Sequence, residues 1–129
     1  MSFRTIAVIT AVVTFVLGIG YLFAGALVVG RWQIEATQSV LLLGRRMGAL
    51  YLGLAVIYFL ARSAPASAAR TALCAGAAVT TSLLALLGVY ERSAGHAGPG
   101  ILASVALESL LALGYIWIFF AERKRATAG

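Results

Sequence analysis

The sequence predicts an all-α integral membrane protein, a single four-helix bundle that takes up residues 1–129. The first observation is composition: 62% of the residues are hydrophobic and 11% are charged, with a mean hydropathy of +1.00. Such a chain cannot present the water-compatible surface of a soluble domain. The second observation is four apolar segments, each long enough to cross about 30 Å of hydrocarbon, which takes about 20 helical residues.

These segments are residues 5–30, 40–61, 68–90 and 100–121. The first is longer than the apolar core of roughly 7–15 residues in a cleaved signal peptide, so we expect it to be a retained helix. The connections are short, and neighbouring helices should therefore pack antiparallel. Between Trp32 and Leu43, polar and apolar residues interleave, as in an amphipathic turn at the membrane interface. It would be a plain connector, the commoner use of such a loop, or a lid over an outer pocket.

Positive charges near the helix ends predict the orientation. One side holds both termini and the connection after the second helix, and its cations are Arg4, Arg62, Arg70, Arg123, Lys124 and Arg125. The other side has Arg31 and Arg92, plus arginines 45 and 46 if these are not buried. This bias predicts cytoplasmic termini in an inner (plasma) membrane. The basic tail would bind anionic headgroups of the bilayer, whereas charges so few and dispersed argue against nucleic-acid binding.

Glu108 is the most informative residue, because its neighbours from Gly100 to Ala121 are apolar or small. A charge at membrane depth costs at least about 2.5–3.5 kcal/mol and usually marks a partner, a pathway or a ligand. Arg45 and Arg46 are the other ionisable residues expected within the membrane. At 1.5 Å per residue they lie about 8–9 Å below Val40, and Glu108 about 12 Å below Gly100. We therefore expect Glu108 to meet one of these arginines.

Membrane helices turn small and polar residues toward one another and leave large aliphatic residues to lipid. Each segment has such a stripe at steps of three and four: Thr10, Thr14, Gly18, Tyr21 and Gly25; Gly44 and Gly48; Ala77, Thr81, Ala85 and Gly88; and Ser104, Glu108, Ala112 and Tyr115. Where the stripes converge they predict one polar, ligand-binding pocket open to the outer side, lined by Tyr21, Arg45, Arg46, Thr81, Ser104 and Glu108.

Each of these residues also has a purely structural interpretation. Gly44 and Gly48 form a GxxxG pair that allows close helix packing, and threonines in helices usually bond their own helix carbonyls. An ion pair of Glu108 with Arg45 could serve only to fix which helices pack together. The sequence predicts no metal or cofactor: Cys74 is a lone thiol, and His96 has no second ligand near it.

Two short motifs resemble the DoxX-like group of small four-helix membrane proteins of unknown function. They are RRMGALYLGLAVI, residues 45–57, and ALESL, residues 106–110. The positions that match the group's pattern are Arg45, Gly48, Gly53 and Glu108. The resemblance implies a compact four-helix bundle in which an Arg–Glu contact can form, and it implies no settled chemistry.

Three functions from different classes remain open. The first is a non-enzymatic protein that binds a lipid-like or amphipathic small molecule, or assists a membrane partner, with Glu108 and Arg45 as polar anchor; it requires least of the sequence. The second is a transporter or channel subunit that uses Glu108 for proton or cation coupling, as a homo-oligomer. The third is a membrane enzyme with Glu108 as general acid or base, which has the least support because no second catalytic group is evident.

Overall fold

The all-α prediction is confirmed. The computed structural model describes residues 1–127, with side chains as far as Lys124. Its helices are α1 (Phe3–Phe23), α2 (Gly25–Gly30), α3 (Gln38–Ala61), α4 (Ala68–Ser93) and α5 (Ile101–Thr127), and the described residues form no strand. All but the short α2 are long and apolar enough to cross a membrane. Many large aliphatic side chains on their outer faces are exposed, as expected of helices that face lipid.

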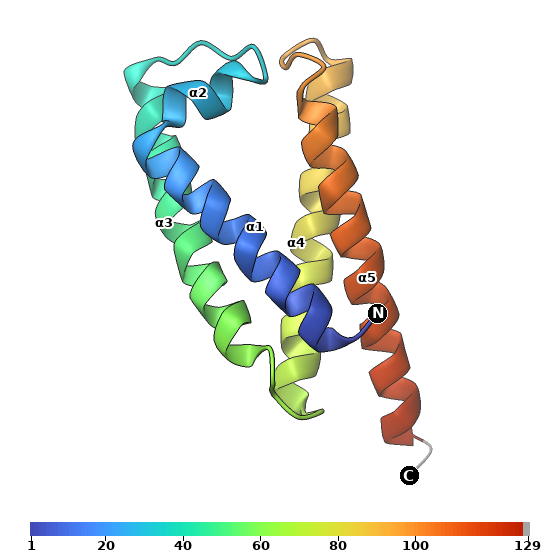
Figure 1. The fold of residues 1–129 in the computed structure, drawn as a ribbon. Helices are drawn as coiled ribbons and strands as arrows, with labels where there is room; N and C mark the ends of the chain where they lie inside the picture. Colours follow the sequence, from blue (N-terminus) through green and yellow to red (C-terminus); the bar gives the residue numbers. More distant parts are fainter. Residues whose placement is uncertain (128–129) are drawn as a thin grey trace.

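The long helices form two antiparallel pairs. α1 packs along α3, and α4 packs along α5, and the pairs diverge from one end of the molecule to the other (Figure 1). The start of α1, the end of α5 and residues 62–67 lie at the end where the pairs converge, called the terminal end below (Figure 1). Residues 31–37 and 94–100 lie at the opposite end, called the loop end.

The first membrane segment is shorter than the predicted 5–30, because the helix breaks at Ala24. Ala24 still donates its N–H to the Gly20 carbonyl, 2.8 Å away, but its φ of −134° and ψ of 37° lie outside the helical region. Two glycines make room for the α2 that follows: a Cβ on Gly20 would lie 3.2 Å from Val28, and one on Gly25 would lie 3.2 Å from Leu41. The break therefore lets α2 pack against the ends of α1 and α3 at the loop end (Figure 1).

Glycine holds the first pair together. A Cβ added at Gly48 would lie 2.9 Å from the Gly18 carbonyl oxygen, and one at Gly44 would lie 3.2 Å from the Tyr21 ring. The predicted GxxxG contact is therefore present, with the α1 and α3 backbones nearly touching. In the second pair, a Cβ added at Gly88 of α4 would lie 2.5 Å from the Val105 side chain of α5.

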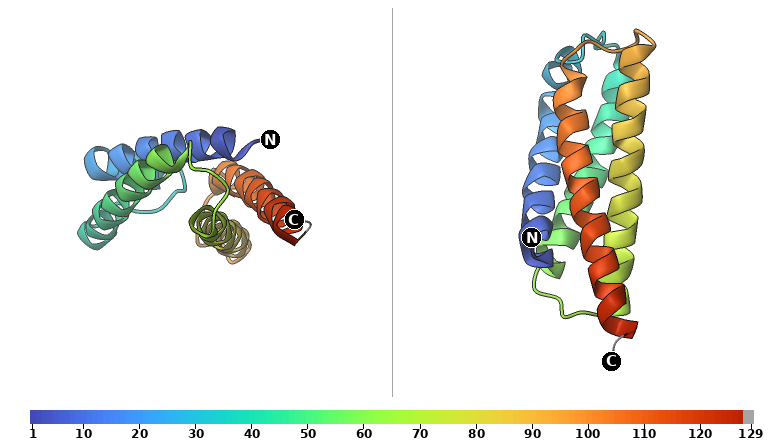
Figure 2. Two further views of the ribbon diagram at one scale, coloured as in Figure 1. Left: turned by 90° about the horizontal axis from the view of Figure 1, so that it is seen from below. Right: turned by 90° about the vertical axis from the view of Figure 1, so that its right-hand side faces the viewer.

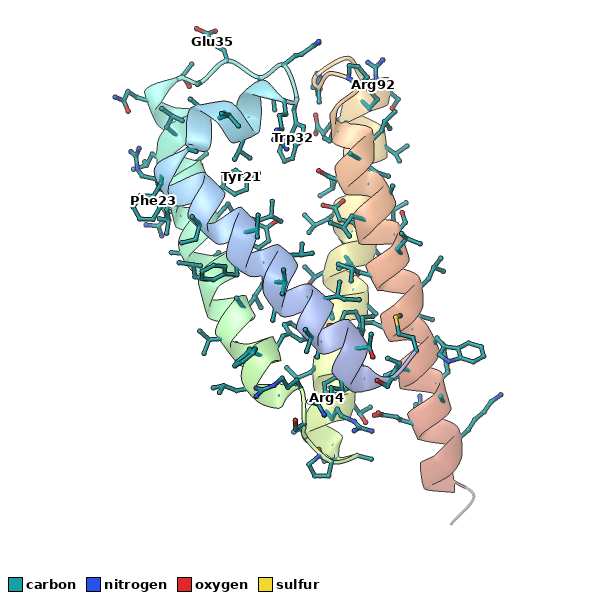
Figure 3. The ribbon with its side chains drawn as sticks, in the orientation of Figure 1. Arg4, Tyr21, Phe23, Trp32, Glu35 and Arg92 are labelled. Atoms are coloured by element: carbon teal, nitrogen blue, oxygen red, sulfur yellow. The ribbon has the colours of Figure 1, made fainter. Side chains whose placement is uncertain are left out.

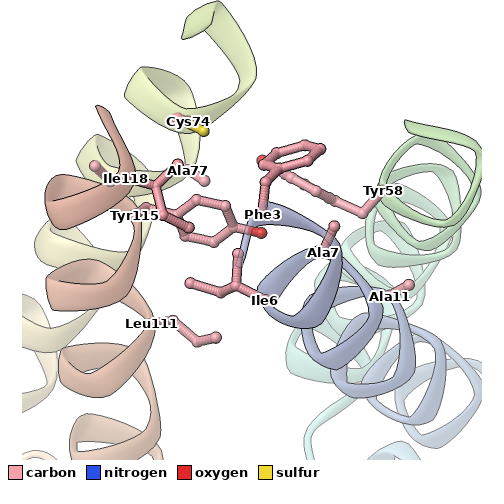
Figure 4. Packing of buried hydrophobic residues seen from close by; sticks show 11 residues of the cluster. Phe3, Ile6, Ala7, Ala11, Tyr58, Cys74, Ala77, Leu111, Tyr115 and Ile118 are labelled. Carbon is pink, nitrogen blue, oxygen red and sulfur yellow. The ribbon is translucent and has the colours of Figure 1, made fainter. Parts of the chain in front are cut away.

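The two pairs meet at the terminal end through a cluster of buried apolar side chains (Figure 4). Tyr115 of α5 is fully buried there, its hydroxyl lies 2.7 Å from Thr10 Oγ1, and its ring lies 5.8 Å from that of Tyr58. Since Thr10 is on α1 and Tyr58 is on α3, Tyr115 fastens the second pair to both helices of the first.

A loop–loop contact joins the pairs at the loop end. Gly98 donates its backbone N–H to the Trp32 carbonyl, 2.6 Å away, and a Cβ on Gly98 would lie 2.7 Å from the Gln33 side chain. Gln33 has a φ of 59°, a left-handed conformation uncommon for residues other than glycine. The two pairs are therefore joined at both ends of the molecule.

Candidate ligand-binding cleft

A cleft of about 710 Å³ lies between the two helix pairs. This volume is in the range of small-molecule sites. Every long helix contributes to its lining, together with Trp32 from the loop end: Thr10, Val13, Thr14, Leu17, Tyr21, Trp32, Tyr51, Leu54, Tyr58, Ala69, Ala72, Leu73, Gly76, Ala77, Thr80, Thr81, Leu84, Ser104, Leu107, Glu108 and Leu111.

Four of the six residues predicted to bind a ligand line this cleft. They are Tyr21 of α1, Thr81 of α4, and Ser104 and Glu108 of α5. The convergence of polar stripes from separate helices therefore located the cleft. Whether these residues bind a ligand stays a prediction.

Arg45 and Arg46 do not line the cleft. Both side chains are exposed on α3, and within the described residues no salt bridge joins either of them to Glu108. The expected ion pair between Glu108 and one of these arginines is therefore not formed in this structure. Of the two groups expected to form a polar anchor, only the Glu108 carboxylate lines the cleft.

Helix geometry explains the correction. Successive residues of an α-helix are separated by about 100° around its axis. Tyr51, Leu54 and Tyr58 define the face of α3 that lines the cleft, and on that wheel Arg45 lies roughly 150° from the centre of this face and Arg46 roughly 110°. The arginines are at a suitable depth, but they project from the wrong side of the helix.

Glu108 is partly buried, and its carboxylate has no hydrogen bond or ion pair among the residues whose side chains are described. It is also the one charged residue in the lining described above. A carboxylate that is desolvated without a partner is costly, so this position favours a counter-charge or donor supplied from outside the chain.

Aromatic rings form the wall of the cleft toward the loop end. The Tyr21 and Tyr51 rings stack, with centroids 6.0 Å apart and an interplanar angle of 11°. Both tyrosines line the cleft together with Glu108. Trp32 lines the same part of the cleft, and Figure 3 shows Trp32 and Tyr21 between the two helix pairs, beneath α2.

Sequence analysis did not identify Tyr51, and it placed Trp32 at the start of the interfacial segment that ends at Leu43. A signal for Tyr51 was available: it follows Gly44 and Gly48 at helical spacing and shares the side of α3 that turns inward. Nothing in the sequence indicated that Trp32 would enter the cleft, because its position depends on the break at Ala24 and on the bond from Gly98.

Hydroxyl groups in the half of the cleft nearer the terminal end are already engaged. Thr14 donates to the Thr10 carbonyl at 2.7 Å, and the Tyr58 hydroxyl donates to the Leu73 carbonyl at 3.2 Å. On α4, nearer the loop end of the cleft, Thr81 donates to the Ala77 carbonyl at 2.7 Å. The expectation that helix threonines bond their own carbonyls is confirmed for Thr14 and Thr81. The bonds of Thr14 and Tyr58 make the half of the cleft nearer the terminal end an apolar surface.

The cleft opens sideways between α3 and α4. Ala69, Ala72, Gly76 and Thr80 line it and are nevertheless exposed, and packing between α3 and α4 is sparse. Viewed along the molecule, these two helices are splayed apart (Figure 2, left). Because the four residues lie within the apolar span of α4, this opening would face the hydrocarbon of a bilayer rather than water.

An ion pair that the sequence did not predict lies at the terminal end. Arg70 of α4 and Glu122 of α5 approach to 2.5 Å, with side chains 15% and 8% exposed. Arg70 also donates to the Ala64 carbonyl at 2.8 Å, and its guanidinium lies over the Phe3 ring, 5.0 Å from the centroid. The sequence analysis used Arg70 only to predict orientation. The pair could have been predicted, because Arg70 and Glu122 lie at the same end of two helices that are neighbours in the sequence.

Comparison with protein-family models, with curated proteins and with solved structures found no match to this chain. The resemblance of residues 45–57 and 106–110 to DoxX-like proteins therefore stays a prediction. Among the described residues, no group of three or more His, Cys, Asp or Glu side chains is placed to hold a metal ion. His96 is next to Glu91, with Nδ1 2.7 Å from a carboxylate oxygen.

Proposed function

We propose that this protein binds an amphipathic, lipid-like small molecule in the cleft between its helix pairs, without catalysing a reaction. The observation that carries the proposal is a largely apolar cleft that opens sideways, within the apolar span of α4, and is lined by one carboxylate without a partner among the described side chains. Apolar pockets with a few well-placed polar groups are the usual form of small-molecule sites.

The cleft has distinct polar and apolar parts. The polar part, toward the loop end, has Glu108, Ser104, Tyr21 and Trp32. Near the terminal end the lining is apolar, as at Leu54 and Leu73, or has its hydroxyl groups already bonded, as at Thr14 and Tyr58. An amphipathic molecule matches this arrangement, with its polar group beside Glu108 and its hydrocarbon toward the terminal end. Such a molecule could enter from the bilayer without crossing water.

The orientation belongs to the same proposal. The excess of Lys and Arg at the terminal end favours cytoplasmic termini, in the inner (plasma) membrane. The loop end, with Trp32 and the Glu108 half of the cleft, then lies toward the outer leaflet. An amphipathic ligand from the outer leaflet would then have its polar group at the depth of Glu108.

Transport is a second candidate, favoured by the unpaired membrane carboxylate. Two contacts weigh against a path through a single copy of the chain. The bond from Gly98 to Trp32 joins the pairs at the loop end, and the Arg70–Glu122 pair lies at the terminal end with little exposure. Transport would therefore require an oligomer or the opening of one of these ends.

Native mass spectrometry of the protein released from its own membrane tests the proposal. Wild type should carry a discrete additional mass, Glu108→Gln should lose it, and Glu35→Gln should keep it. Glu35 is a matched control because its side chain is exposed outside the cleft. If all three proteins carry only bulk lipid, the binding proposal is wrong, and the oligomer count from the same spectra then decides whether transport should be pursued.

A further inference from the structure

We infer that the ligand of this cleft is a lipophilic cation, whose ammonium group sits between Glu108 and the aromatic wall and whose hydrocarbon chain extends toward the terminal end. This inference deepens the proposed function and rests on it. It names the chemical class of the ligand, which the sequence analysis left open.

The charge of the cleft decides between ligand classes. With Arg45 and Arg46 on another face of α3, Glu108 is the one charge in the lining, and it is negative. A cation would compensate a carboxylate that has no partner within the described part of the chain, whereas an anion would add a second uncompensated charge. Buried charges are tolerated when paired.

The aromatic side chains near Glu108 favour an ammonium group in particular. Tyr21 and Tyr51 stack with their centroids 6.0 Å apart and line the same cleft as Glu108. Trp32 lines the same part of the cleft. Aromatic faces attract cations, and sites that combine several rings are a common means of binding alkylated ammonium groups.

The rest of the cleft suits one long hydrocarbon chain. Its lining on α4 runs from Ala69 to Leu84, a rise of about 22 Å at 1.5 Å per residue. Toward the terminal end the Thr14 and Tyr58 hydroxyls already donate to backbone carbonyls, so an alkyl chain there leaves no donor of these residues unsatisfied. Access is lateral, past Ala72 and Gly76, which have small side chains and are exposed.

An ammonium group of this kind could belong to a free single-chain amine or to a choline headgroup. We would therefore compare four probes with the same sixteen-carbon chain in maltoside micelles: hexadecyltrimethylammonium, hexadecylphosphocholine, hexadecanoate and hexadecyl maltoside. Binding is measured as one-to-one adducts in native mass spectrometry and as the shift in the thermal unfolding midpoint. Wild type, Glu108→Gln, Glu35→Gln, Tyr51→Leu and Tyr90→Leu are compared; Tyr90 is exposed and outside the cleft.

We expect the ammonium probe to bind wild type and raise its unfolding midpoint, and hexadecanoate and the maltoside to do neither. Glu108→Gln should weaken binding about tenfold or more, as expected for the loss of a close charge pair in a partly buried site. Tyr51→Leu should weaken it about two- to fivefold through the lost cation–π contact. Glu35→Gln and Tyr90→Leu should bind as wild type does.

The other outcomes separate the two levels of the proposal. If hexadecanoate or the maltoside binds as well as the ammonium probe, the inference of a cation is overturned while the binding function stands. If phosphocholine binds and the simple ammonium does not, the phosphate is being recognised and the inference is again overturned. If no probe binds wild type, both proposals fail. The comparison of probes on wild type decides these cases even if Glu108→Gln does not fold.

Discussion

Gly48→Ala should destabilise the protein, whereas Gly53→Ala, the same change on the same helix, should not. A Cβ at Gly48 would lie 2.9 Å from the Gly18 carbonyl oxygen and 3.1 Å from Tyr21 Cβ. Both neighbours belong to α1, and the oxygen is backbone, so one helix must move. A Cβ at Gly53 would meet nothing within 4 Å. The comparison therefore isolates the close approach of α1 and α3.

The magnitude follows from two terms. Replacing glycine by alanine in a helix gains about 0.5–1 kcal/mol at either position through backbone entropy. Overpacking a close contact costs about 1–3 kcal/mol, and only Gly48→Ala incurs it. The helix-propensity gain cancels in the comparison, so Gly48→Ala should be less stable than Gly53→Ala by about 1–3 kcal/mol.

Unfolding in mixed micelles, followed by circular dichroism as the denaturing detergent fraction rises, gives the two free energies of unfolding. Gly53→Ala should match or slightly exceed wild type. Equal free energies for the two alanine variants would refute the claim that contact between glycine backbones holds the first helix pair together.

Three further predictions follow from other contacts. Glu122→Gln should lower the free energy of unfolding by about 2–4 kcal/mol, because it leaves Arg70 buried without its counter-charge, and adding Arg70→Gln should recover part of the loss; an additive double variant would contradict the pair. Tyr115→Phe should cost about 1 kcal/mol through the lost Thr10 bond, and Thr10→Ala with Tyr115→Phe should cost little more than either change alone. Arg45→Gln should alter neither the unfolding midpoint nor ligand retention, since its side chain is exposed outside the cleft; a loss of ligand would return this arginine to the site.

Much of the fold was predictable because the membrane restricts the choices. An apolar run of about 20 residues has few options other than a helix, since its backbone groups must bond internally. The inward stripe of α1 was also predictable: Thr10, Thr14, Gly18 and Tyr21 are all buried. The break at Ala24 was not, because it lies inside a continuous apolar run and is fixed by the packing of α2.

The candidate site was predictable in part for the same reason. Small and polar residues at helical spacing located the Glu108 face of α5 and the Thr81 face of α4. Depth suggested Arg45 or Arg46 as partner, and the family resemblance pointed to Arg45, but depth does not determine which way a helical residue points. The information was present in Gly44 and Gly48, since a GxxxG pair that faces α1 turns the adjacent Arg45 and Arg46 away from the cleft.

Of the two carboxylates of α5, Glu122 has a counter-charge within the described residues and Glu108 has none. This difference favours a ligand-binding role over a structural role for Glu108. The two carboxylates are 14 residues apart, about 21 Å along the helix. Glu122 is paired with Arg70 and is 8% exposed, so the chain itself neutralises it. Glu108 faces a cleft that opens sideways, with no counter-charge among the described residues.

A residue retained for stability alone would be expected to resemble Glu122. Glu122→Gln should therefore lower the unfolding midpoint and leave the affinity for hexadecyltrimethylammonium unchanged. Glu108→Gln should do the reverse: with no ligand present its unfolding midpoint should equal or exceed that of wild type, because an uncompensated charge has been removed, while ammonium binding is lost. If Glu108→Gln is instead the less stable of the two without ligand, Glu108 has a partner within the protein and the cleft does not depend on an external cation.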